Sequence, residues 1–332
     1  MRDFYFSHLI TFIGLVAAYW WGGIEGFVIA SILIVMEVSL SFDNAVVNAT
    51  ILKDMSEKWQ KRFLTWGILI AVFGVRLVLP IILVAFATGL GMLEVTQLAF
   101  SNPDEYSRHV LASNIEISTF GGMFLLMVFL HFIFDESKDT HWIGFLERKL
   151  ATAGRMESLE IIIAVGILLG LQSFLPDGVK LIAVVSGLIG VLLYVAINST
   201  MRLISLNGHS ANKSLGHAGF VGFMYLELLD ISFSLDGVIG AFAISKDVVI
   251  IMLGLGVGAM FVRSLTVYMV KKGTLDKYVF LEHGAHYGIG ALAIIMLIST
   301  MEHVPEAVTG FIGVAFIGLS LWSSVRYNKR VG

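Results

Sequence analysis

Carboxylates and amides gather in two short stretches of this sequence that are otherwise apolar. The first stretch reads EVSLSFDNAVVNA at residues 37–49, and the second reads ELLDISFSLDG at residues 227–237. Seven of their side chains carry oxygen atoms suited to a hard divalent cation: Glu37, Asp43, Asn44, Asn48, Glu227, Asp230 and Asp236. The chain has no cysteine, which excludes thiolate ligands. The chemistry on offer is therefore oxygen ligation of Mn²⁺, Ca²⁺ or Mg²⁺.

Helical spacing divides these polar residues between two faces. Glu37, Ser41, Asn44 and Asn48 form one stripe, while Asp43 shares another face with Ser39. The second stretch repeats this pattern, with Ser232 and Ser234 on the polar faces. Acids six residues apart point roughly 120° away from one another on an ideal helix. Either the helices unwind around residues 40–44 and 233–237, where Gly237 favours a break, or the two acids of each stretch face different neighbours.

Ionised carboxylates in hydrocarbon need counter-charges, because each costs roughly 2.5–3.5 kcal/mol to insert. Two basic residues, Arg76 and Arg263, fall in apolar runs at similar depth. We expect them to balance charge or gate access, although a salt bridge that fixes helix packing is the alternative. The five acids still exceed the two arginines, and a divalent cation with one protonated carboxyl nearly neutralises the surplus.

Four further polar residues lie where the third helix of each half is expected to begin. Glu116 begins one such helix near the outer mouth, and Glu282, His283 and His286 begin the other near the inner mouth. They are candidates for access gates or proton relays. The alternative is that they are interfacial polar residues with no part in transport.

The elements that must position these residues are membrane helices. The chain of 332 residues is 57% hydrophobic and only 14% charged, a composition typical of a polytopic membrane protein. A span needs roughly 20 apolar residues. We predict an all-α bundle of ten spans, at about 8–22, 24–52, 63–92, 117–135, 159–175, 179–203, 218–245, 247–271, 284–301 and 306–328.

Basic residues predict the orientation of this bundle. Lysine and arginine outside the spans fall mostly in connections that share a side with both termini, whereas the opposite side holds Arg108, Lys180 and Lys246. Both termini are therefore expected in the cytoplasm, with the chain in the cytoplasmic (inner) membrane. The longest cytoplasmic connection, residues 136–158, mixes aromatic residues with charges and predicts an amphipathic surface helix that anchors or links.

An internal repeat organises the bundle. Residues 230–242 align without a gap with residues 37–49, so that Glu37 falls on Asp230 and Asp43 falls on Asp236. Because the two motif helices are the second and seventh spans, they cross in opposite directions, which predicts two inverted repeats of three helices. The expected organisation is an extra span (1–23), the first repeat (24–135), the linker (136–158), two connecting spans (159–203), the second repeat (218–301), and a final span with its tail (302–332). Such transporters hold their substrate near the midplane.

The patterns ExxLSFDN and ELLDxSFSLDG resemble the TerC family of integral membrane proteins, within the wider LysE-like transporter superfamily. The stretches FGGMFLLMVFLHFIFDESKDTHW and HGAHYGIGALAIIML are more similar to an uncharacterised branch of it. The resemblance implies handling of metal ions, particularly manganese export, and an association with tellurite resistance. It assigns the acidic motif to Glu37, Asp43, Asn44, Glu227, Asp230 and Asp236. Gly237 departs from the polar residue expected there.

We therefore expect a transporter, not an enzyme, that exports a divalent cation by alternating access, with protons or the membrane potential as the coupling force. Its expected partners are the lipid bilayer and the transported ion, and nothing predicts nucleic-acid binding. An exporter of small organic solutes such as amino acids is one alternative. An intramembrane aspartyl protease using Asp43 and Asp236 is another, disfavoured because no GxGD string occurs. A membrane scaffold is the third.

Overall fold

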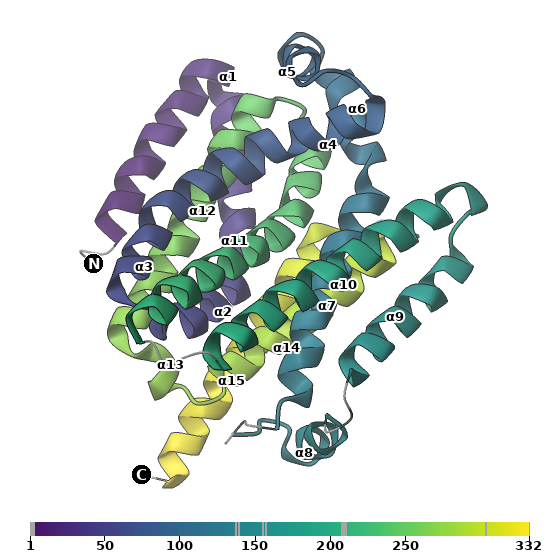
Figure 1. Cartoon of the computed structure of the whole chain (residues 1–332). Helices are drawn as coiled ribbons and strands as arrows, with labels where there is room; N and C mark the ends of the chain where they lie inside the picture. Colours follow the sequence, from purple (N-terminus) through teal and green to yellow (C-terminus); the bar gives the residue numbers. More distant parts are fainter. Residues whose placement is uncertain are drawn as a thin grey trace.

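The computed structural model describes residues 4–136, 138, 140–154, 156, 158–206, 211–302 and 304–331, and its regular structure there is helical (Figure 1). The α-helices are α1 (Tyr5–Leu40), α2 (Phe42–Lys53), α3 (Glu57–Arg62), α4 (Leu79–Thr88), α5 (Met92–Ser101), α6 (Pro103–Ala112), α7 (Asn114–Phe134), α8 (Gly144–Ala153), α9 (Leu159–Leu171), α10 (Asp177–Leu206), α11 (Ala211–Ile244), α12 (Val248–Lys272), α13 (Thr274–Lys277), α14 (Leu281–Ser299) and α15 (Glu306–Val331). Two π-helical segments, Phe63–Gly67 and Ile70–Val78, connect α3 to α4.

Seven helices of the described chain are long and apolar enough to cross a membrane. They are Tyr5–Leu40, Glu57–Ile82, Asn114–Phe134, Asp177–Met201, Val248–Lys272, Leu281–Ser299 and Val308–Arg330. The predicted all-α class is confirmed for the described residues, and the count of ten spans is not. One reason is that α9 has 13 residues. Another is that α11 carries three of the motif acids, which lower its hydropathy.

A glycine divides α1 into two arms. Gly23 has φ 63° and ψ −150°, a conformation open to glycine because it lacks a Cβ. A Cβ on Gly26 would lie 2.7 Å from the carbonyl oxygen of Ala18, so the arms pack closely beyond the turn. Figure 1 shows the chain reversing there. The predicted spans 8–22 and 24–52 are thus joined by a turn, and the first packs on α12, where the Ser7 hydroxyl lies 2.5 Å from that of Ser264.

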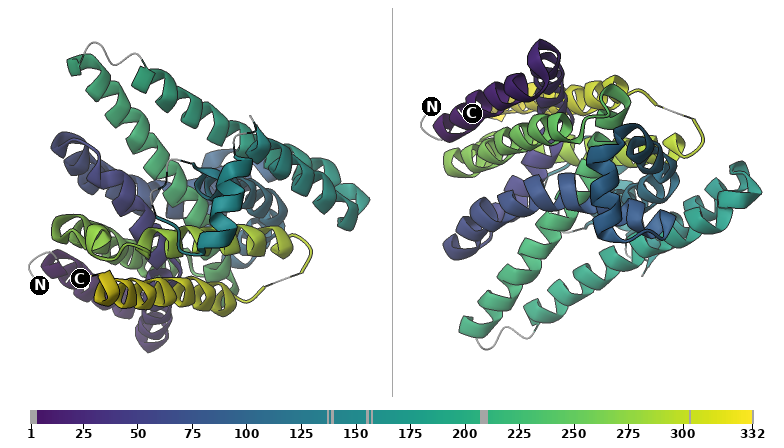
Figure 2. Two further views of the ribbon diagram at one scale, coloured as in Figure 1. Left: turned by 90° about the horizontal axis from the view of Figure 1, so that it is seen from below. Right: turned by 90° about the horizontal axis from the view of Figure 1, so that it is seen from above.

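The centre of the bundle is formed by α7 and α14, which lie side by side in opposite directions. The side-chain amide of Asn114, at the start of α7, donates to the carbonyl of Ser299 at the end of α14 over 3.2 Å. Gly121 and Gly122 let α14 approach, because a Cβ on Gly122 would lie 3.1 Å from the side chain of Leu297. In both views of Figure 2, α9 and α10 form one edge of the bundle, opposite α1.

Both ends of the chain lie near the C-terminal end of α12. The ring of Phe4 lies 5.7 Å from that of Tyr268, measured between centroids. The side-chain amide of Asn328, in the last turns of α15, donates to the carbonyl of Lys277 over 2.8 Å. This end also carries Lys271 and Lys272, so the basic residues and the two termini share one end of the bundle.

Candidate functional site

The helix that carries the first acidic motif is interrupted at Ser41. Helix α1 ends at Leu40, Ser41 has φ −102° and ψ 16°, and α2 begins at Phe42. The backbone N–H of Ser41 still donates to the carbonyl of Glu37 over 3.0 Å, so the break is one residue wide. Helix α11 carries the second motif and continues without interruption from Ala211 to Ile244. Unwinding is thus present near residues 40–44, and the break favoured at Gly237 does not occur.

The first charge pair joins Glu37 of α1 to Arg76. Both side chains are 2% exposed, and the Arg76 guanidinium donates to the Glu37 carboxylate. The hydroxyl of Ser41 donates to the same carboxylate oxygen over 3.2 Å. Arg76 lies in the π-helical segment Ile70–Val78. Pro80 follows this segment and has no backbone N–H to donate to the preceding turn. This wider helix also exposes the carbonyl of Ala71, which accepts a second hydrogen bond from Arg76.

The second charge cluster joins two acids of α11 to Arg263 of α12. One guanidinium nitrogen of Arg263 lies 3.3 Å from the Glu227 carboxylate and 3.2 Å from the Asp230 carboxylate. The other donates to the carbonyl of Phe63 over 2.9 Å, and the guanidinium lies 4.1 Å from the centre of the Phe63 ring. Gly67 makes room for this cluster, because a Cβ there would collide with Arg263 and Glu227. Each arginine therefore pairs with the acidic motif of its own half.

The two motif helices touch through these clusters. The side-chain amide of Asn44 donates to the Asp230 carboxylate over 2.9 Å. A Cβ on Gly237 would lie 3.2 Å from the Glu37 carboxylate, so the glycine admits that acid instead of breaking the helix. Since Asn44 aligns with Gly237 and Asp230 with Glu37, the two contacts join equivalent positions of the repeated motifs. One contact is made by an amide and the other by a glycine.

Asp43 lies on a different face from these clusters. It is 3% exposed and accepts a hydrogen bond of 2.9 Å from the backbone N–H of Asn44. Its other carboxylate oxygen lies 3.0 Å from where a Cβ of Gly288 on α14 would be, and 3.6 Å from that of Gly313 on α15. The two acids of the first motif thus face different neighbours, as helical spacing allowed. Asp236 is half-buried on α11.

The seven predicted ligands do not converge in this arrangement. Among the residues that the structure describes, no group of three or more histidine, aspartate or glutamate side chains is placed to hold a metal ion. The arginines pair with three of the five motif carboxylates, those of Glu37, Glu227 and Asp230. Four buried oxygens of the motifs have no hydrogen-bond partner within the described chain: Asn44 Oδ1, Asn48 Oδ1, Glu227 Oε2 and Ser234 Oγ. These atoms retain capacity to bind a polar ligand.

The remaining motif hydroxyls are satisfied locally. Ser39 donates to the carbonyl of Val35 over 2.7 Å, and Ser232 donates to that of Leu228 over 2.9 Å. Hydroxyls that bond one turn back along their own helix are poorly placed to ligate an ion. Ser39 and Ser232 thus contribute to the helices, whereas Ser41 contributes to the Glu37 pair.

The residues at the predicted mouths lie at opposite ends of the central pair of helices. Glu116 is half-buried in the first turn of α7. Glu282, His283 and His286 occupy the first turns of α14, and the ring of His286 stacks on Phe132 with 3.9 Å between centroids. His283 lies 2.9 Å from the carbonyl of Thr140 in the linker. None of these four touches the acid–arginine clusters through a described hydrogen bond or ion pair.

One acid of the linker is buried in the structure although its sequence pattern carries no signal of burial. Glu147 of α8 is fully buried and accepts hydrogen bonds from the backbone N–H groups of Trp142 and Ile143, over 3.1 and 3.0 Å. The hydroxyl of Tyr287 on α14 donates to it over 3.0 Å, and His283 lies 3.5 Å away. The linker is thus anchored to the second half of the bundle. The amphipathic pattern of the linker places Glu147 among charges expected at the surface, so the pattern could not predict that this side chain is buried.

A family model described as "Protein of unknown function (DUF475)" matches residues 42–331, which includes both acidic motifs except Glu37 and its neighbours. No curated protein and no solved structure matches the chain.

Proposed function

Since the chain belongs to DUF475, a family of unknown function, we propose its activity from its own buried charges: it is a membrane transporter that exports a divalent metal cation. The observation that carries this proposal is the contact between Asn44 of α2 and Asp230 of α11, which joins the two motif helices where each also carries a buried acid paired with an arginine. Manganese is the proposed cargo through the resemblance to the TerC family, and that relationship is part of the proposal.

The surplus of buried negative charge supports a cation as cargo. Glu37, Glu227 and Asp230 share only two guanidinium groups, which leaves one negative charge in the paired clusters. Asp43, which is 3% exposed at the start of α2, adds a fourth acid. Buried carboxylates without full compensation are costly, and in membrane proteins they are retained where ions or protons pass. A divalent cation balances the two surplus charges.

Displacement of an arginine is the step that loads the cargo. The two guanidinium groups neutralise the carboxylates in this conformation, so a cation reaches Glu37 or Asp230 only as its arginine moves away. The π-helical segment around Arg76 favours such movement, because π-helical turns are less stable than α-helical turns and are frequent at functional sites. The arginines thereby keep the site neutral when no cargo is present.

We further propose that the bundle has ten spans and two inverted repeats. The supporting observation is that each motif helix pairs with an arginine on the helix that follows it. The arms of α1, together with α9 and α11, supply the additional spans. Alternating access then arises from movement of one repeat against the other around the acid clusters. The basic residues at the end that holds both termini support a cytoplasmic location for that end.

Transport by the purified chain in proteoliposomes tests the proposal. A fluorescent indicator inside the vesicles reports Mn²⁺ entry, and an imposed pH gradient tests coupling. Asp43→Asn and Asp236→Asn each remove one motif charge and are expected to reduce the initial rate by at least tenfold, on the order of one lost ion contact. Asp177→Asn is the matched control, because that side chain is 97% exposed at the start of α10.

Three outcomes reject the proposal. Wild-type vesicles that take up no Mn²⁺, Ca²⁺ or Mg²⁺ contradict cation transport. Motif variants that transport at the wild-type rate remove the motif from the mechanism. Uptake of amino acids in place of metal ions supports the organic-solute alternative.

Cells that lack the protein are expected to accumulate manganese and to grow poorly in its excess.

A further inference from the structure

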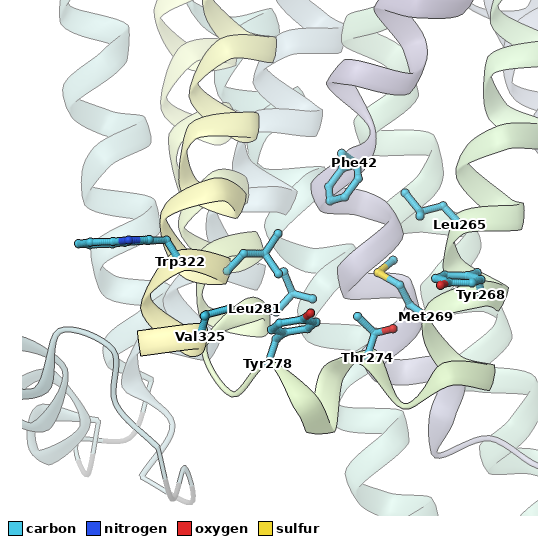
Figure 3. A pocket seen from close by; sticks show the side chains of 10 residues that line it. Phe42, Leu265, Tyr268, Met269, Thr274, Tyr278, Leu281, Trp322 and Val325 are labelled. Atoms are coloured by element: carbon cyan, nitrogen blue, oxygen red, sulfur yellow. The ribbon is translucent and has the colours of Figure 1, made fainter. Parts of the chain in front are cut away.

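A cavity with a volume of about 430 Å³ lies between α2, α12, α14 and α15, at the end of the bundle where both termini lie (Figure 3). Phe42 and Leu265 lie toward one end of it, and Thr274 and Tyr278 lie toward the other. Most of its lining side chains are apolar, and three of them carry hydroxyls: Tyr268, Thr274 and Tyr278. The cavity is thus apolar at one end and polar at the other.

The apolar part of the cavity opens sideways from the bundle. Two of its lining residues belong to the outer face of α15, Trp322 with 61% of its surface exposed and Val325 with 40%. On a helix long and apolar enough to cross a membrane, this face meets hydrocarbon. Tryptophan and tyrosine around the opening are typical of the boundary between hydrocarbon and headgroups. A chain from the surrounding leaflet can therefore enter the cavity.

Two exposed basic residues flank the polar end. The Lys277 ammonium lies 5.3 Å from the centre of the Tyr278 ring, and the Arg326 guanidinium lies 5.5 Å from that of the Trp322 ring. The neighbouring acid, Asp276, lies 3.8 Å from Lys53. The rim is therefore positively charged beside the hydroxyls, which complements a phosphate group.

We infer that this cavity binds one anionic phospholipid, with an acyl chain between α12, α14 and α15 and its phosphate at Lys277 and Arg326. The inference stands apart from the proposed transport activity. Phe42 forms one wall of the cavity and is the first residue after the break at Ser41. A bound acyl chain therefore packs against the start of α2 and holds this short helix beside α14.

A second cavity provides an internal comparison. It has a volume of about 500 Å³ and is lined by Ser39 and apolar residues of α1, α11 and α15, none of them charged. Both cavities can accept acyl chains, and the basic rim belongs to the first. Preference for an anionic lipid over a neutral one is thus expected at the first cavity alone.

Native mass spectrometry of the full chain, released from nanodiscs, tests the inference. The discs contain phosphatidylcholine with a small fraction of phosphatidylglycerol. One phosphatidylglycerol is expected to remain bound to wild type in preference to phosphatidylcholine. A basic residue near an anionic lipid is worth about fivefold in affinity, so Lys277→Gln combined with Arg326→Gln should weaken binding roughly thirtyfold. Lys58→Gln combined with Lys61→Gln is the control, because it removes the same amount of charge from the exposed face of α3.

A second pair of variants tests the cavity itself. Leu265→Trp fills the first cavity and is expected to abolish retention of phosphatidylglycerol, whereas Val314→Trp fills the second and should leave it unchanged. Equal retention of both lipids by wild type overturns the inference. So does unchanged preference in the Lys277 and Arg326 variant, which alters only exposed side chains and remains informative if Leu265→Trp fails to fold. Retention by folded Leu265→Trp places the lipid elsewhere.

Discussion

Replacement of Arg263 by glutamine should destabilise the bundle more than any single loss of a surface charge. The Arg263 side chain is 4% exposed and serves two carboxylates and the carbonyl of Phe63. Glutamine is too short to reach all three and carries no charge, so Glu227 and Asp230 would stay buried without a counter-ion. Breaking a buried pair from one side costs about 3–5 kcal/mol.

The thermal midpoint is the quantity to measure, on protein in nanodiscs of one lipid composition. For a chain of a few hundred residues, about 2–4 °C are lost per kcal/mol, so Arg263→Gln should melt at least about 6 °C below wild type. Arg148→Gln is the control, because Arg148 is exposed and its guanidinium donates to Gly144 of its own helix over 2.6 Å. The control should shift the midpoint by about 1–2 °C at most.

A triple variant separates lost charge balance from lost packing. Adding Glu227→Gln and Asp230→Asn to Arg263→Gln removes the uncompensated acids and should recover at least half of the lost midpoint, because coupled groups are not additive. An Arg263→Gln midpoint equal to that of Arg148→Gln would refute the reasoning, because the ion pairs of Arg263 would then make no measurable contribution to stability. A triple variant less stable than Arg263→Gln would show that packing, not charge, gives Arg263 its importance.

Three further predictions follow from contacts outside that cluster. Gly258→Ala should destabilise the bundle by about 1–3 kcal/mol, because the new Cβ would lie 2.5 Å from the Cβ of Glu37. Gly318→Ala has open space around it and should be neutral or stabilising in the same melting assay. Glu147→Ala removes the acceptor that holds the linker, so amide hydrogens of residues 140–153 should exchange at least about tenfold faster by deuterium-exchange mass spectrometry. The hydrogen bond from Lys246 holds the pKa of exposed Asp104 below its ordinary value. The Asp104–Lys246 pair therefore stabilises the fold above about pH 4, and this stabilisation disappears as the pH falls further. The difference in thermal midpoint between wild type and Asp104→Asn should shrink as the pH falls below about 4 and also in high salt.

Sequence reasoning recovered the elements of the candidate site better than their geometry. It paired the two motifs and assigned an arginine to each. It left open whether the helix unwinds at residues 40–44 or the two acids face different neighbours, and both occur in the first motif. The expected role of Gly237 was wrong, because propensity describes how easily a glycine bends and says nothing of what lies opposite it. In the structure the space beside Gly237 holds the Glu37 carboxylate, so the missing Cβ serves close approach within a continuous helix.

By itself the sequence determined the helical, apolar character of the chain and the identity of the acids in its two motifs, because hydropathy and helical spacing are local properties. It also determined which polar residues share a helical face. Only the tertiary structure decided that Asp43 turns toward Gly288, that Asn44 meets Asp230, and that Glu147 reaches the second half of the bundle. These contacts depend on how each helix rotates about its axis and how closely it crosses its neighbours. Both are set by glycines and bulky side chains from distant segments, which no local pattern brings together.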